Sequence, residues 1–131
     1  MFLTKECDYA IRVVRALSGM EKKTVKEICD LEHVPFNFAY KILKKLERAG
    51  IVQSIRGAHG GYQLSKALNK ISLFDIISAA DTELYINECL KPGHECINNM
   101  NGKLCSVHQE LGQIQANLTD ILKAKTFDML K

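Results

Sequence analysis

The sequence lacks the features that direct a chain into or across a membrane. No apolar run approaches the roughly 18 residues that a spanning helix needs. The first residues, Met1 to Glu6, do not contain the long apolar segment of a signal peptide. The cysteines number five, and an odd number without a secretion signal argues against a disulfide framework. We therefore expect a cytoplasmic protein with no membrane contact.

Repeats and low-complexity tracts are also missing, and what remains has the composition of one globular domain. The 131 residues are 47% hydrophobic and 25% charged, which is enough for a packed core. The net charge is only +3, but residues 1–60 contain 11 Lys or Arg against 7 Asp or Glu, whereas the remainder contains 7 against 8. A basic first half suits phosphate binding, although an ordinary solvated surface explains the same charges equally well.

Three helices are predicted in the first 50 residues. Thr4 is suited to cap a helix that runs to about Leu17, and the segment 24–27 has the form of a capping box that opens a second helix. Ile28 and Leu31 give this second helix its apolar side. A short turn at 32–34 leads to the third helix, so the pair has the pattern of a helix-turn-helix.

The third helix of this series is bounded by two residues with special backbone preferences. Pro35 fits its first turn, where the missing N–H has no cost, and Gly50 fits the position just after its end. Four apolar residues run down one face: Phe36, Ala39, Leu43 and Leu46.

A β-hairpin is predicted directly after the third helix. Residues 51–55 and 62–64 read as strands, and the segment between them is a glycine-rich tip that carries Arg56 and His59. A hairpin in this place is typical of the wing of a winged helix-turn-helix, and glycines let its backbone approach DNA closely.

The second half of the chain contains a long helix after an irregular, cysteine-bearing segment. A shorter helix is predicted from Ser72 through Ala80, whereas residues 82–105 show no period. The long helix, from about Ser106 to Lys125, has an apolar stripe made of Val107, Leu111, Ile114, Leu118, Ile121 and Leu122. The helix either folds back so that the stripe covers the core, or pairs with the same helix of a second copy of the chain. We favour pairing, because a homodimer matches a palindromic DNA site.

The predicted fold is mainly α-helical: a winged helix-turn-helix with a small hairpin wing and a long C-terminal dimerisation helix. Residues 1–80 are expected to form the DNA-binding domain. Residues 81–131 are expected to form a cysteine loop and the dimerisation helix, which make one compact unit with the first part.

Six segments together resemble the Rrf2 family of bacterial winged-helix transcription regulators. The similarity covers nearly the whole chain and rests on 3–10, 26–28, 41–46, 49–52, 54–57 and 60–64, together with the three later cysteines. The family includes a regulator of iron–sulfur assembly and a nitric-oxide-sensitive repressor. The resemblance implies a homodimeric regulator, most simply a repressor, rather than an enzyme.

DNA is expected to meet the beginning of the third helix and the wing. The N-terminal part of a recognition helix contacts base edges in the major groove, and aromatic side chains there can contact thymine methyl groups or sugars. Lys44, Lys45 and Arg48 lie further on and are expected to meet phosphates. In similar proteins an arginine of the wing reaches the minor groove. The expected DNA contacts are Asn37, Phe38, Tyr40, Lys41, Lys44, Arg56 and His59.

The cysteines of the irregular segment are candidate ligands of an iron–sulfur cluster. Cys89, Cys96 and Cys105 are separated by six and then eight residues, unlike the tight pairs of zinc ribbons. Thiolates suit soft metals, and the family resemblance favours a two-iron or four-iron cluster, which aerobic handling can remove. His108 is the first candidate for the fourth ligand.

Four other side chains compete with His108 for the fourth position: Asp8, His33, His94 and Glu95. A ligand on Asp8 or His33, from the same or the partner subunit, would tie the cluster directly to the DNA-reading unit. A non-cysteine ligand also makes a cluster easier to lose or oxidise, which suits a sensor of redox state, nitric oxide or iron–sulfur supply.

Three alternatives stay open at this stage. The cysteines can be free thiols that form a reversible disulfide. The protein is then a cluster-free repressor of cysteine or sulfur metabolism, and it responds to oxidation or to a partner enzyme. Cys105 with His108 can in principle act as nucleophile and base, but no oxyanion-hole motif accompanies them. A winged-helix module that binds only proteins would show no salt-dependent DNA affinity.

Overall fold

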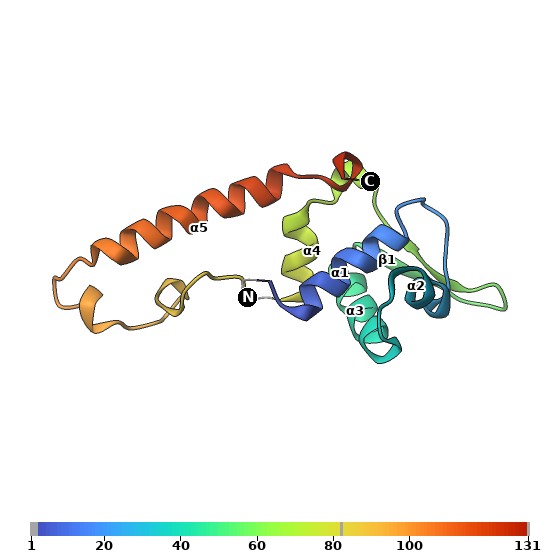
Figure 1. The fold of residues 1–131 in the computed structure, drawn as a ribbon, viewed down its shortest axis with the longest axis horizontal. Coiled ribbons are helices and arrows are strands. Elements are labelled where there is room, and N and C mark those ends of the chain that lie inside the picture. The colour runs from blue at the N-terminus through green and yellow to red at the C-terminus, as the bar shows by residue number, and fades with distance from the viewer. Residues whose placement is uncertain (1–2, 82, 131) are drawn as a thin grey trace.

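The computed structural model describes residues 3–81 and 83–130, and it has an elongated shape (Figure 1). A body of four helices and one hairpin occupies one end, and the long last helix extends from it with the cysteine loop at its far end. The helices and strands are α1 (Lys5–Ala16), α2 (Val25–Glu32), α3 (Phe36–Arg48), β1 (Val52–Ile55), β2 (Gly61–Leu64), α4 (Leu73–Ala80) and α5 (Ser106–Ala124). Four short 3₁₀ turns complete the order: η1 (Leu68–Lys70), η2 (Glu88–Leu90), η3 (Ile97–Asn99) and η4 (Phe127–Met129).

The predicted starts of α1, α2 and α4 are confirmed, and a side chain bonds a free amide in the first turn of each. The Cys7 amide donates to Thr4 Oγ1, and reciprocal capping boxes join Thr24 with Glu27 and Ser72 with Asp75. Pro35 differs slightly from the prediction: it is the residue before the first turn, with extended backbone at φ −60° and ψ 139°. Gly50 follows the end of α3 with a φ of +75°, as expected of a glycine in that place.

The core lies where α1 crosses α3 and α4, with α2 closing one side. Its largest fully buried side chains come from the four helices of the body, from β1 and from the segments beside them: Val13, Val14, Leu17, Ile28, Ile42, Leu43, Leu46, Ile51, Val52, Ile71, Ile76 and Ile77. Each such aliphatic side chain contributes about 1.5–3 kcal/mol through burial. Leu31, which we predicted on the apolar side of α2, is instead 57% exposed, because no element covers that position of the helix.

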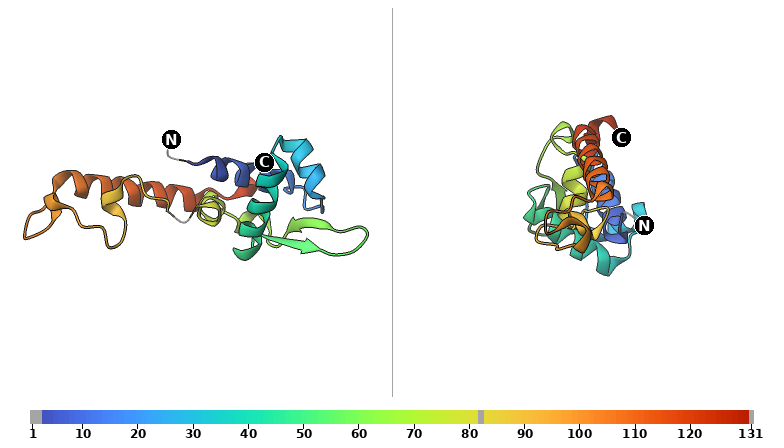
Figure 2. Two further views of the ribbon diagram at one scale, coloured as in Figure 1. Left: turned by 90° about the horizontal axis from the view of Figure 1, so that it is seen from below. Right: turned by 90° about the vertical axis from the view of Figure 1, so that its left-hand side faces the viewer.

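The hairpin is a two-stranded antiparallel sheet that projects from the body. Val52 pairs with Leu64 at its base and Ile55 with Gly61 near its tip. A bridge between Lys23 and Tyr62, with two N–H···O bonds of 2.8 Å, fixes β2 to the segment that precedes α2. Figure 2 shows the hairpin at the opposite end of the molecule from the cysteine loop.

The last helix, α5, has no buried residue and is attached to the body by its C-terminal end. The Leu73 amide donates to Lys125 O at 2.9 Å, and the amide of the buried Phe127 donates to Ile71 O at 2.8 Å. Midway along α5, the Gln115 side chain bonds the backbone of Leu84 and Ile86 and holds this segment, which follows α4, against the helix. Among the described residues, no helix is both long and apolar enough to cross a membrane.

Candidate nucleic-acid interface and cysteine loop

The helix-turn-helix is held in shape by α1. His33 ends α2 with a left-handed backbone (φ 55°, ψ 45°), and this turns the chain sharply toward α3. Arg12 donates to the Glu32 carbonyl oxygen at 3.1 Å, and Arg15 binds the Glu32 carboxylate through two nitrogens. Hydrogen bonding and the charge of Glu32 raise the pKa of Arg15. The turn before the recognition helix is therefore fixed by two charged contacts from a neighbouring helix.

The structure divides the predicted contacts of α3 between its exposed and its inner face. Asn37, Tyr40, Lys41 and Lys44 are exposed at or near the beginning of the helix. Phe38 is half-buried, packs against the core and has its ring 5.2 Å from that of Tyr9. A DNA contact by Phe38 stays a prediction, since the geometry gives it a packing role first.

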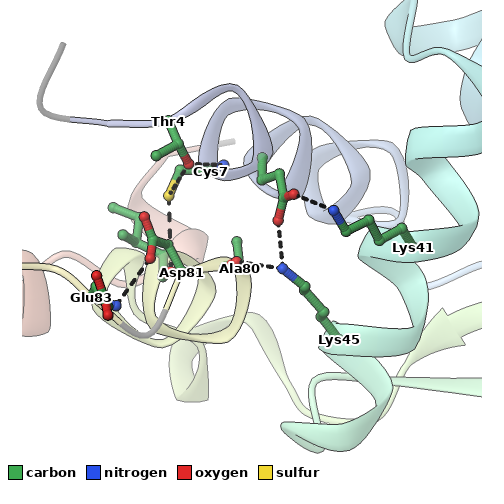
Figure 3. Close-up of polar contacts among 9 residues, drawn as sticks. Thr4, Cys7, Lys41, Lys45, Ala80, Asp81 and Glu83 are labelled. Carbon is green, nitrogen blue, oxygen red and sulfur yellow. Dashed lines mark hydrogen bonds and ion pairs between the residues drawn. The ribbon is translucent and has the colours of Figure 1, made fainter.

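Glu6 at the start of α1 binds two lysines of the recognition helix (Figure 3). Its carboxylate accepts from Lys41 at 2.6 Å and also from Lys45, and these bonds lower the pKa of Glu6. Lys45 donates in addition to the carbonyl oxygen of Ala80 at the end of α4, at 3.0 Å. A phosphate contact by Lys45 stays a prediction, and its ammonium group already bonds Glu6 and the Ala80 carbonyl oxygen within the body.

Phe36 is a surface residue that sequence reasoning placed with the buried ones. Ala39, Leu43 and Leu46 are buried as expected, whereas Phe36 is 55% exposed and makes an edge-on contact with the ring of Tyr40, centroid to centroid 4.9 Å. The spacing of four residues between the two aromatics was the signal that they share a face. Whether that face is buried or exposed could not be predicted without the position of α2 and the wing.

The wing presents both predicted contacts at its exposed tip. Arg56 and His59 are exposed, and a bond of 3.0 Å from the Gly60 amide to Gly57 O closes the turn between them. Gly57 has a φ of +114°, which a residue with a side chain rarely adopts. A Cβ at Gly60 would lie 2.4 Å from Ile55 O, so the tip owes its tight form to these glycines.

The cysteine loop brings some of the predicted ligands together. Cys89, Cys96 and His108 line one hollow, with His94 and Glu95 at the same place. Cys105 caps α5: its Sγ accepts the His108 amide at 3.4 Å. In the part of the chain that the structure describes, His108 Nδ1 is buried and has no hydrogen-bond partner.

The candidate ligands lie in the same loop, but their side chains do not surround a common metal position. Within residues 3–81 and 83–130, no three His, Cys, Asp or Glu side chains lie close enough together to hold a metal ion. Asp8 is paired with Arg12 at 3.1 Å on α1, and His33 lies in the turn between α2 and α3, so both belong to the body rather than to the loop. Two thiols, a buried imidazole nitrogen without a partner and a third thiol at a helix N-terminus form a soft donor set that fits an iron–sulfur cluster.

Comparison with known proteins places this arrangement in a family. The Rrf2 profile, described as an iron-dependent transcriptional regulator, matches residues 3–131. The chain is 29% identical to the regulator IscR of Pectobacterium carotovorum over 99% of its length and 79% of the relative's. It is 27% identical to the regulator NsrR of Shouchella clausii over 84% of its length and 76% of the relative's.

A solved structure shares the whole fold. CymR of B. subtilis, named a global cysteine regulator, superposes with a TM-score of 0.77 at 22% identity and covers 98% of this chain and 94% of its own. The fold and the relatives are those of transcriptional regulators, which are not enzymes, and the predicted winged-helix class is confirmed. The chain belongs to the Rrf2 family of DNA-binding transcriptional regulators.

Proposed function

We propose that this protein is a cytoplasmic, homodimeric repressor that binds a palindromic operator and senses redox state, nitric oxide or iron–sulfur supply through an iron–sulfur cluster. The observation that carries the sensing proposal is the hollow lined by Cys89, Cys96 and His108, with His108 Nδ1 buried and unpartnered among the described residues. The family description as iron-dependent supports the same conclusion.

DNA recognition is assigned to the exposed beginning of α3 and to the wing. Asn37, Tyr40, Lys41 and Lys44 contact the major groove and its phosphates, whereas Arg56 and His59 reach the adjacent minor groove. Binding of a labelled duplex, measured by fluorescence anisotropy, is expected to weaken steeply as salt rises. Affinity that does not depend on salt would instead indicate a protein-interaction module.

Dimerisation is assigned to the exposed stripe of α5. Val107, Ile114 and Ile121 are all more than half exposed although they are large and apolar, and they lie along one side of a helix that extends from the body (Figure 1). Pairing with a second α5 buries this stripe and places two recognition helices on one DNA site.

The cluster is assigned to the three loop cysteines with His108 as the fourth ligand. When bound, it supplies a centre that changes with oxidants, nitric oxide or loss of iron. Cys105 lies at the N-terminus of α5, where its Sγ accepts the His108 amide. His108 would bind through its buried Nδ1, which has no hydrogen-bond partner among the described residues. Gln115 holds the segment around Ile86 against α5.

Anaerobic purification with a visible spectrum and iron and sulfide analysis tests the cluster. We expect absorption near about 400 nm and similar amounts of iron and acid-labile sulfide. Cys89→Ala, Cys96→Ala and Cys105→Ala should each lose the cluster, and His108→Ala should weaken it more than His94→Ala. Cys29→Ala is the matched control: it removes a thiol from α2, outside the loop, whose pKa burial raises.

The second candidate is a cluster-free thiol switch, and it is favoured by the open arrangement of the loop. Among the described residues no three candidate ligands lie close enough together to hold a metal ion, and the structure of the cysteine regulator CymR shares the whole fold. Under this alternative the anaerobic protein is colourless after reconstitution, and mild oxidation links two loop cysteines, which mass spectrometry of the non-reduced protein detects. DNA binding then responds to the disulfide or to a partner enzyme.

A further inference from the structure

The exposed aromatic pair at the beginning of α3 has no packing role in the body. Phe36 is 55% exposed and Tyr40 43% exposed, while the remaining apolar residues of α3 face inward. The two rings lie one helical turn apart and meet edge to face, which holds each in one orientation. Apolar surface kept exposed and fixed in this way is typical of a contact with a partner.

The surroundings of the pair identify the kind of partner. Phe36 and Tyr40 border a groove that is completed by the N-terminus of α2, at Thr24 and Lys26, and by the strand residue Tyr62 of the wing. The groove therefore lies between the two elements that a winged helix applies to DNA. Exposed lysines flank the pair on the same helix, at 41 and 44, so the partner carries negative charge around an apolar feature.

Duplex DNA offers one apolar group of this kind in its major groove, the C5-methyl group of thymine. We propose that Phe36 and Tyr40 together form a pocket wall that reads a thymine methyl group, and that Phe36 determines operator specificity. The inference rests on the proposed function and deepens it. Phe38 does not take this part, because its ring packs inward against Tyr9.

Replacing thymine by deoxyuridine removes only that methyl group and leaves every phosphate and hydrogen-bonding edge in place. The probe is a fluorescein-labelled duplex recovered with the full-length protein from a pool of random sequences, remade with deoxyuridine at one thymine at a time. At one or two positions the wild type should bind about fourfold more weakly, which is the effect of losing one buried methyl group.

Four variants locate the effect. Phe36→Ala should bind the thymine duplex more weakly and should not distinguish it from the deoxyuridine duplex, whereas Tyr40→Phe, which keeps the ring, should still distinguish them. Met129→Ala, which shortens another exposed apolar side chain, on η4, should behave as the wild type. Lys44→Ala should lose affinity for both duplexes alike and reduce the salt dependence.

The outcomes separate this inference from the proposed function. If wild type binds the selected duplex with strong salt dependence but does not distinguish deoxyuridine at any position, the methyl-reading role is overturned and DNA binding stands. If Phe36→Ala keeps the full sensitivity of the wild type, Phe36 is not the residue that reads the methyl group. If no duplex is bound in a salt-dependent way, the proposed function fails, and the inference fails with it.

Discussion

Glu6 has two lysine partners, and their surroundings give them different roles. Lys45 is the more enclosed and also bonds the Ala80 carbonyl oxygen, so it joins α1, α3 and α4 (Figure 3). Lys41 is more exposed and belongs to the face of α3 that we assign to DNA. The Glu6 carboxylate therefore competes with a DNA phosphate for one lysine while it fixes the other inside the body.

Glu6→Gln should strengthen DNA binding, because Lys41 then has no anionic partner within the protein. The slope of log affinity against log salt should steepen by up to about 0.9, the contribution of one further phosphate contact. Anisotropy titrations at several salt concentrations measure this slope. Glu21→Gln removes the same charge at an exposed position of the α1–α2 connection, and an equal steepening there would show that only net charge matters.

The same ion pair should make stability depend on pH in one direction. The lowered pKa of Glu6 means that the folded state favours the carboxylate, so the stabilising contribution is complete above the ordinary glutamate pKa of about 4.3. It is lost as the pH falls through the lowered pKa. The difference in urea midpoint between wild type and Glu6→Gln should be largest near neutral pH and shrink on acidification, and a difference that stays constant would contradict this.

Residue exposure was the least predictable property of the sequence. Helical spacing placed Phe36 and Leu31 on apolar faces, yet both are more than half exposed. The spacing indicates which residues share a side of a helix, but whether another element covers that side depends on tertiary packing. The contacts of Phe38 and Lys45 inside the body could not be predicted for the same reason, since neither the Tyr9 ring nor the Glu6 carboxylate can be placed from local sequence.

Secondary-structure elements were predicted well because their boundaries are set locally. Thr4, Thr24 and Ser72 each cap a helix with bonds that span only three residues, and the glycines of the wing sit where the hairpin turns. The order of the elements and the wing followed from these signals. The attachment of the wing to the segment before α2 was not visible in the sequence, because it depends on a backbone bridge at Lys23.

Gly61→Ala should loosen the wing by disturbing this bridge. A Cβ at Gly61 would lie 2.6 Å from the backbone oxygen of Lys23, so one of the two segments must shift. We expect a loss of about 1–3 kcal/mol in the free energy of unfolding, measured by urea denaturation, together with weaker DNA binding. Gly19→Ala is the matched control, since nothing lies within 4 Å of its added Cβ, and a similar loss there would argue against a specific clash.

The stripe of α5 allows a direct test of the dimer. Ile114→Glu places a charge in the middle of the stripe and should weaken self-association by about tenfold or more, because an isoleucine buried at an interface contributes about 1.5–3 kcal/mol. Sedimentation velocity over a range of concentrations measures the change. Gln113→Glu introduces the same charge at an exposed polar position of the same helix, and dissociation by both variants alike would contradict the assigned stripe. From sequence alone the stripe fitted folding back as well as pairing.

At the scale of the whole molecule, the loop that we propose as the sensor is separated from the surface that we assign to DNA. The cysteine loop and the wing lie at opposite ends of the long axis (Figure 2), and within one subunit α5 and the body connect them. The three loop cysteines were predicted as ligands from their spacing and the family resemblance. The open geometry around them was not, because the loop has no hydrophobic period from which to predict its path.

Cys89→Ser should therefore keep DNA binding and lose the response of DNA binding to the cluster. Iron-free Cys89→Ser should bind DNA within about twofold of the iron-free wild type, since no residue of the reading surface is changed. Reconstitution with iron and sulfide should alter the DNA affinity of the wild type and leave that of the variant unchanged. A variant that responds to reconstitution as fully as the wild type would remove Cys89 from the sensing centre.

α5 contacts the body through its C-terminal half and extends beyond it, so this helix can act as a lever arm. Its 19 residues span about 28 Å, so a tilt of about 10° at its junction with the body displaces the far end by about 5 Å. In a dimer formed through α5, the same tilt would also change the distance between the two copies of α3. The spacing of operator half-sites that such a dimer accepts would therefore report the angle between α5 and the body of each subunit.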